Sequence, residues 1–116
     1  MLKFFKSFGY ASEGISHAFK SERNFRVHII AATIVVVASI LTGLSMFEWL
    51  IILVLIGGML ALEMVNSAIE RTVDAITVNR NPLAKQAKDL AAGAVFIFAI
   101  TSAVIGLFIF IPKWFI

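Results

Sequence analysis

Two stretches of the sequence carry no formal charge and are long enough to cross a lipid bilayer. Residues 27–47 form one stretch, between Arg26 and Glu48, and residues 90–112 form the other, between Asp89 and Lys113. About 20 apolar residues in a helix cross the ~30 Å hydrocarbon core of a membrane. The sequence therefore predicts transmembrane helices at 27–47 and, with one flanking residue, at 89–112.

The segment between these two stretches predicts a third span. Residues 49–62 are uncharged, but this stretch alone is too short to cross a bilayer as a helix. Read as one helix over residues 48–78, the segment is long enough and carries ionisable groups in its second half. We therefore expect an all-α integral membrane protein, a single domain over 1–116, with a loop at 79–88 joining the second and third spans.

The composition agrees with this class. Hydrophobic residues make up 60% of the chain and the mean hydropathy is +0.97, whereas soluble proteins are about 45–50% apolar. Disordered chains are poor in aromatic and β-branched residues, yet this one has 11 phenylalanines. It has no cysteine, which excludes a disulfide framework, a thiolate zinc site and a cysteine nucleophile.

The basic residues predict the orientation. Nine of the ten lysines and arginines lie before residue 27 or between residues 71 and 88, and only Lys113 lies on the other side. Positively charged flanks stay in the cytosol, so we expect the N-terminus inside and the C-terminus outside. A cleaved signal peptide would need a short apolar core near the start, but charges interrupt residues 3–26 repeatedly.

Residues 1–22 predict an amphipathic surface helix. Phe4, Phe8, Ala11, Ile15 and Phe19 recur at helical spacing, and the charged side chains fall largely on other faces. Such helices lie in the membrane interface. The helix is either an anchor or the wall of a site at that depth, and the residues alone favour the anchor.

A polar stripe on the second span carries the chemistry. At ~100° per residue, five polar side chains fall within one face about 100° wide, and the remainder of the helix is apolar. Ionisable groups inside a span cost roughly 3 kcal/mol each and therefore face a protein interior or a wet cavity. The stripe consists of Glu63, Asn66, Ser67, Glu70 and Asp74.

The depth of the stripe suggests a reaction at the membrane surface. At 1.5 Å per residue, Glu63 lies about 9 Å below the cytosolic boundary, Glu70 near it and Asp74 beyond it. A lipid hydroxyl reaches one end, and a soluble charged cosubstrate reaches the other. Three carboxylates on one face repel each other, and Mg²⁺, which binds carboxylates together with substrate phosphates, would relieve that repulsion.

Other interpretations of the stripe remain open at this point. It could be a polar contact between helices, a path for ions or a solvated helix end, and the last is favoured for Asp74 alone. A small cation channel is disfavoured because residues 49–62 are entirely apolar. Candidate cationic partners at the same level are Lys85, Lys88 and Arg26.

Three segments resemble the small prokaryotic diacylglycerol kinase family. Residues 61–74 (ALEMVNSAIERTVD) resemble its signature, E-x-x-N-[ST]-A-I-E-x-x-x-D; residues 87–95 resemble its second block, and residues 21–26 the segment before its first span. The resemblance covers the whole chain. One branch of the family phosphorylates diacylglycerol, and the Gram-positive branch, which residues 22–26 resemble more, phosphorylates undecaprenol.

The resemblance implies a role for each matching residue. Glu63 matches the general base, and Glu22 and Glu70 match the pair that holds the metal on MgATP. Other matches lie around the phosphates and the nucleotide: Asn66, Lys88, Asp89, Tyr10 and Asp74. It also implies a homotrimer with active sites shared between protomers, in a bacterial cell membrane, with ATP and a lipid alcohol as substrates and no nucleic acid partner.

At two positions the sequence departs from the family pattern, so the family's contacts cannot be carried over to them. His28 stands where the proteobacterial branch has an acidic residue, and Asn79-Arg80-Asn81 replaces a commoner acidic-aromatic loop. From the residues alone, His28 is interpreted as a packing or interfacial side chain. The lipid substrate, undecaprenol or diacylglycerol, is not decided by the sequence.

Overall fold

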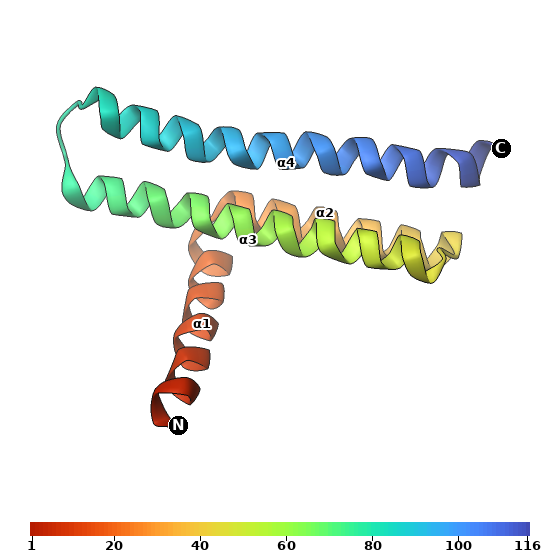
Figure 1. The fold of residues 1–116 in the computed structure, drawn as a ribbon, viewed down its shortest axis with the longest axis horizontal. Coiled ribbons are helices and arrows are strands. Elements are labelled where there is room, and N and C mark those ends of the chain that lie inside the picture. Colours follow the sequence, from red (N-terminus) through yellow and green to blue (C-terminus); the bar gives the residue numbers. More distant parts are fainter.

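A computed structural model describes all residues, 1–116, as four helices. They are α1 (Leu2–Ser21), α2 (Arg23–Thr42), α3 (Met46–Ile76) and α4 (Pro82–Phe115). Helices α2, α3 and α4 run side by side, and α1 projects away from them at a steep angle (Figure 1). The chain thus has three long helices and a projecting arm.

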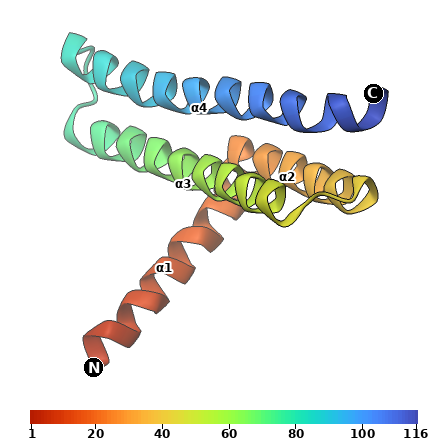
Figure 2. The same cartoon turned by 45° about the vertical axis from the view of Figure 1, so that its right-hand side comes forward.

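Helix α3 lies at the centre of the bundle. Helices α2 and α4 flank it on different sides, as two views show (Figures 1 and 2). The small core at one end is formed by Ile52 of α3 with Ile109 and Phe110 of α4. Because α3 contacts every other helix, its polar stripe lies where the other elements can meet it.

The structure has three long helices, as predicted, but the first span was placed too late: it was expected at 27–47, whereas α2 ends at Thr42 and residues 46–47 already belong to α3. Gly43, with a positive φ, ends α2, and the Ser45 cap starts α3, so the uncharged stretch is interrupted by a turn.

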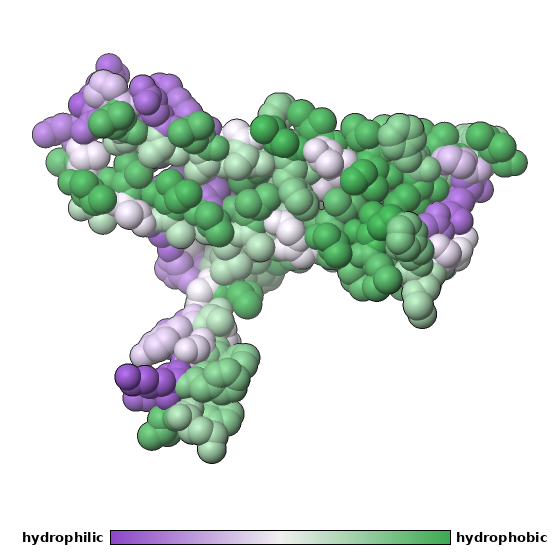
Figure 3. Space-filling model, in the orientation of Figure 1, coloured by the Kyte–Doolittle hydropathy of each residue, from purple (hydrophilic) through white to green (hydrophobic).

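Each of the three helices is long and apolar enough to cross a membrane, and the face of the bundle shown in Figure 3 is largely hydrophobic. Only 10 of the 116 residues are buried, so most of the apolar side chains face outward. Polar residues gather at the two ends of the bundle and on α1 (Figure 3), which is the distribution expected of a membrane protein.

The expected loop at 79–88 is shorter in the structure, because residues 82–88 already belong to α4. The Asn81 side chain accepts hydrogen bonds from the backbone N–H groups of Leu83 and Ala84, and Pro82 occupies the first turn. An asparagine cap followed by proline is a strong helix start. Only residues 77–81 therefore connect α3 and α4.

The turn between α1 and α2 is fixed by hydrogen bonds. Glu22 has an extended backbone conformation and separates the two helices. The Arg26 guanidinium donates to the carbonyl oxygens of Phe19 and Lys20, each at 3.0 Å. These bonds satisfy carbonyls that the end of α1 leaves without partners, so the end of α1 is tied to the start of α2.

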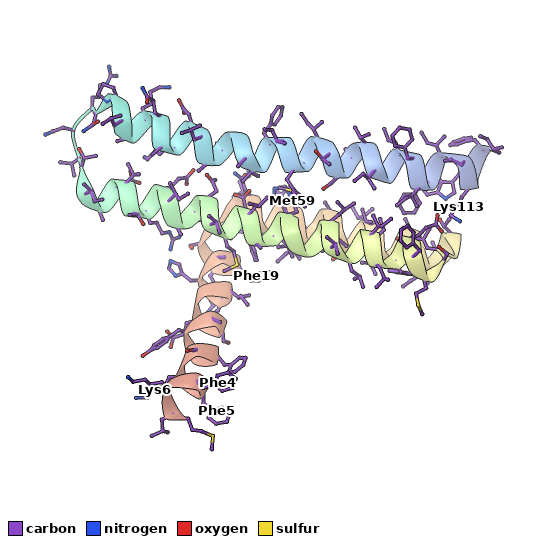
Figure 4. All side chains as sticks on the ribbon, viewed as in Figure 1. Phe4, Phe5, Lys6, Phe19, Met59 and Lys113 are labelled. Carbon is purple, nitrogen blue, oxygen red and sulfur yellow. The ribbon has the colours of Figure 1, made fainter.

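The opposite end of the bundle is closed by polar contacts. Lys113 lies 3.0 Å from Glu48 (Lys113 is labelled in Figure 4), and Trp114 Nε1 donates to Thr42 at 2.8 Å. Glu48 also forms a capping box with Ser45 at the start of α3. These contacts hold α2, α3 and α4 together at the end remote from the polar stripe.

Candidate active site

The polar stripe of α3 is partly buried within the single chain. Glu63, Asn66 and Ser67 are only 3%, 8% and 7% exposed. Further along the helix, Glu70 is intermediate and Asp74 is exposed. The stripe therefore runs from a covered region to open solvent, as its depth along the predicted span indicates.

Glu63 is a buried carboxylate with one polar partner. His28 Nε2 on α2 lies 3.5 Å from Glu63 Oε2, and the structure gives Glu63 no other ion pair or hydrogen bond. Its carboxylate is therefore removed from water and has a single polar neighbour.

Asn66 and Glu70 form a second group one turn away. Asn66 Nδ2 donates to Glu70 Oε1 at 3.4 Å, while Asn66 Oδ1 is buried without any hydrogen-bond partner. Buried polar atoms are normally satisfied. Amide and carboxylate oxygens are the donors that hard cations such as Mg²⁺ accept, so these residues fit a metal.

Glu22 is held by a residue that sequence reasoning did not assign to the site. Arg71 donates to Glu22 Oε1 at 2.6 Å and to Ser21 Oγ at 3.0 Å. The sequence placed Arg71 only among the basic residues that set orientation. Its position next to Glu70 in the signature, one turn from the covered stripe, was the signal available in the sequence.

The single chain does not assemble a metal site. No group of three or more His, Asp or Glu side chains lies close enough to hold an ion. Glu22 pairs with Arg71. Further oxygen ligands would come from water, from phosphates or from a second chain.

Lys88 and Asp74 join α4 to α3 at the solvated end. Lys88 Nζ lies 2.6 Å from Asp74 Oδ1, and this hydrogen bond, with the nearby carboxylate charges, raises the pKa of Lys88 above its ordinary value. Asp89 instead pairs with Lys85 of its own helix at 2.6 Å. The structure thus brings Lys88, but not Asp89, into contact with the stripe.

A cleft of about 830 Å³ lies between the end of α3 and the start of α4. Asp74 and Lys88 line it, with the cations Arg80 and Lys85 and the connection containing Asn79 and Asn81. Three cationic side chains around one cleft attract anions such as phosphates. Tyr10 stands apart, because it is 69% exposed on α1, which points away from the bundle (Figure 2).

Comparison with known proteins identifies the family. A family model described as "Prokaryotic diacylglycerol kinase" matches residues 9–110. The chain belongs to the prokaryotic diacylglycerol kinase family. Membership in this kinase family confirms the lipid-kinase interpretation over a cation channel.

Curated relatives of this kinase include enzymes named for two different lipids. The chain is 55% identical over 111 residues to the undecaprenol kinase of Bacillus subtilis (strain 168), covering 96% of this chain and 90% of the relative. It is 38% identical over 108 residues to a diacylglycerol kinase of Synechocystis, covering 91% of this chain and 61% of the relative. It is 31% identical over 99 residues to the diacylglycerol kinase of Escherichia coli (strain K12), covering 85% and 81%.

Proposed function

We propose that the protein transfers the γ-phosphate of ATP to the hydroxyl of undecaprenol at the cytosolic membrane surface. The observation that carries the choice of lipid is the 55% identity to the Bacillus subtilis undecaprenol kinase over nearly the whole chain. No other relative described above approaches this identity. The residues of the α3 stripe supply a consistent chemistry for the transfer.

Glu63 acts as the general base in this proposal. Its carboxylate accepts the proton of the lipid hydroxyl, and the oxygen then attacks the γ-phosphorus. Phosphoryl transfer depends mainly on positioning and charge stabilisation, and a buried base near its substrate fulfils the first requirement. Asn66 lies one turn further toward the phosphates and positions the reacting groups.

Mg²⁺ is the proposed cofactor, held by Glu70 and Glu22 together with the phosphates of ATP. The bound ion would neutralise charge that develops on the phosphates. The unpartnered Asn66 Oδ1 beside Glu70 supports an oxygen-rich site. Glu22 reaches such a site only if its bond to Arg71 is exchanged or if it serves another chain.

The nucleotide is proposed to bind in the cleft between α3 and α4. Lys88 is a cation there at neutral pH, and its hydrogen bond to Asp74 raises its pKa further above the ordinary value. Asp74 and Asp89 lie on the two helices at this end, and Tyr10 would reach a nucleotide from α1. We propose that this end is cytosolic, with the C-terminus outside, in the cell membrane of a bacterium.

Helix α1 is proposed to lie in the membrane interface, and three chains are proposed to assemble around shared sites. The side chains of Phe4, Phe8 and Phe19 are all more than half exposed on α1 (Phe4 and Phe19 are labelled in Figure 4). Shared sites would supply the ligands that one chain lacks. The incomplete metal site in a single chain supports this arrangement.

A direct assay tests the lipid substrate. Purified protein in mixed micelles receives MgATP with undecaprenol or diacylglycerol at equal mole fraction, and the phosphorylated lipid is quantified. We expect undecaprenol to be the better substrate by kcat/KM, and Glu63→Gln to reduce transfer to below a few percent of wild type. Preference for diacylglycerol, the substrate in the names of several relatives, would replace undecaprenol in the proposal. Absence of transfer to either lipid would contradict a lipid kinase.

A further inference from the structure

Arg71 ties α3 to the joint between α1 and α2. Its guanidinium donates to Ser21 Oγ at 3.0 Å and to Glu22 Oε1 at 2.6 Å, and these two residues end α1 and separate it from α2. No other hydrogen bond or ion pair joins α1 or this joint to α3. Arg71 is therefore the only polar contact that sets where Glu22 lies relative to the polar stripe.

The backbone on both sides of Glu22 is fixed. Glu22 is the single residue between α1 and α2, and its backbone N–H donates to the carbonyl oxygen of Ala18 at 2.9 Å. Ala18 before the joint and Phe25 after it are both buried. Because the main chain has little freedom here, the bond to Arg71 decides the direction in which the Glu22 carboxylate points.

This bond occupies one oxygen of the carboxylate. Glu22 Oε1 accepts from Arg71, whereas the structure gives Glu22 Oε2 no hydrogen bond. Carboxylates that bind metal ions are commonly hydrogen-bonded to an outer partner, which fixes their orientation. A carboxylate with one oxygen held by an arginine and the other free matches that arrangement.

The contact also places Glu22 at about the level of Glu70. Arg71 follows Glu70 directly in the sequence, so the two lie about 1.5 Å apart along the axis of α3, with side chains about 100° apart around it. Glu22 is thus held beside the stripe, and within one chain it completes no cluster of metal ligands. In this position it can serve the stripe of a neighbouring chain without giving up Arg71.

We propose that Arg71 is a positioning residue, which orients Glu22 so that its free oxygen binds the Mg²⁺ ion in a site shared with a neighbouring chain. The inference rests on the proposed function of Glu22 as a metal ligand. Arg71 touches neither the metal nor a substrate, and it acts through Glu22. Arginine suits the role because its planar guanidinium loses less side-chain freedom per hydrogen bond than the flexible chain of lysine.

The sign of the effect separates this role from simple competition. A cation that only competed with Mg²⁺ for Glu22 would weaken metal binding, so its removal would lower the Mg²⁺ requirement. An outer partner that orients a ligand has the opposite effect, and its loss typically costs about 10–100-fold in metal affinity or activity. We therefore expect removal of Arg71 to raise the Mg²⁺ requirement.

The experiment compares wild type with Arg71→Gln, Arg71→Lys, Glu22→Gln and the double variant Arg71→Gln/Glu22→Gln. Arg23→Gln is the matched control, because it removes the same charge next to Glu22 and the Arg23 side chain forms no hydrogen bond or ion pair. Two quantities are measured in mixed micelles. One is the Mg²⁺ concentration for half-maximal lipid phosphorylation, and the other is Mn²⁺ binding by electron paramagnetic resonance with a non-hydrolysable ATP analogue, which needs no turnover.

We expect Arg71→Gln to weaken Mn²⁺ binding and to raise the Mg²⁺ requirement on the order of tenfold or more. Arg71→Lys should lose less, and Arg23→Gln should match wild type. Saturating Mg²⁺ should restore most of kcat in Arg71→Gln, which it would not do for a misfolded protein. In the Glu22→Gln background, Arg71→Gln should cause no further loss, because its effect passes through Glu22.

Three results would overturn the inference. Unchanged or tighter Mn²⁺ binding in Arg71→Gln would show that Arg71 does not orient a ligand. An equal loss from Arg71→Gln with and without Glu22 would show that it acts by another route. Wild-type Mn²⁺ binding in Glu22→Gln would remove the proposed metal role of Glu22 and the inference with it, whereas a normal Arg71→Gln beside a defective Glu22→Gln refutes the inference alone.

Discussion

At the residue scale, the carboxylates of α3 differ in their surroundings although they share one face. Glu63 is covered and beside an imidazole, Glu70 accepts a hydrogen bond from Asn66, and Asp74 is exposed and paired with Lys88. Their order from buried to solvated follows from helical periodicity and depth, so sequence reasoning could predict it. Lys88 was among the cations expected near the stripe, and it pairs with Asp74. The histidine partner of Glu63 was not predicted, because it comes from another helix and is not a formal cation.

Metal dependence tests the assignment of Glu22 and Glu70. We predict that Glu22→Gln and Glu70→Gln each raise the Mg²⁺ concentration needed for half-maximal activity, since each removes one charged oxygen ligand. Glu48→Gln is the matched control, because Glu48 lies at the other end of α3 and binds Lys113. Activity is titrated with Mg²⁺ at fixed ATP. An unchanged requirement in both site variants would remove these residues as ligands.

The pair between Lys88 and Asp74 predicts an alkaline pH dependence. The folded-state pKa of Lys88 is raised above its ordinary value of 10.5, so the stabilisation is complete below pH 10.5 and is lost as the pH rises through the folded-state pKa. Asp74→Asn should therefore lower the melting temperature at pH 8 but not at the most alkaline pH tested. The effect is small because both side chains are largely solvated.

Thermal melts of both proteins from pH 7 upward provide the measurement. A difference between wild type and Asp74→Asn that grows toward high pH would contradict the sign of the shift. A constant difference across the series would assign the effect of the substitution to something other than the charge on Lys88.

At the element scale, α3 and α4 approach each other closely at a glycine. A methyl group added at Gly58 would lie 2.6 Å from the ring of Phe98, whereas one added at Gly57 would meet nothing within 4 Å in the chain. Small residues allow membrane helices to pack closely. Gly58 faces α4 whereas the adjacent Gly57 does not, because adjacent residues lie about 100° apart on a helix.

Gly58→Ala should therefore destabilise the packing of α3 on α4. Overpacking typically costs about 1–3 kcal/mol, which exceeds the gain in helix propensity of up to about 1 kcal/mol when glycine becomes alanine. We expect a lower melting temperature in detergent for Gly58→Ala than for Gly57→Ala. Equal melting temperatures for the two variants would show that the Phe98 contact does not limit the approach of the helices.

The three long helices were largely predictable from the sequence, whereas their exact ends and the contacts between them were not. Uncharged length and the polar stripe predicted the three long helices. The third span was predicted to start at residue 89, although the helix already begins at Pro82, because Lys85, Lys88 and Asp89 interrupt the uncharged stretch. The bonds of Arg71 to Glu22 and Ser21 join residues about 50 positions apart, and no periodic pattern within one element indicates such a contact.

At the scale of the whole molecule, one chain is incomplete in two respects. It leaves most of its large apolar side chains exposed, which lipid and neighbouring helices would cover. It also pairs Glu22 with Arg71 and Asp89 with Lys85, and it leaves Tyr10 exposed, so these three side chains form no contact with the carboxylates of the stripe. Both features agree with active sites that residues from neighbouring protomers complete, the central claim of the account.

Mixing variants that each lack activity at a limiting Mg²⁺ concentration tests that claim most directly. Glu63→Gln chains are dissociated and reassembled with Glu22→Gln chains, and separately with Asp89→Asn chains, and lipid phosphorylation is measured once trimers are verified. A shared site restores about a quarter of wild-type activity in at least one mixture, since random assembly gives about that fraction of sites two intact contributions. No recovery in either mixture of verified trimers would contradict a site shared between protomers.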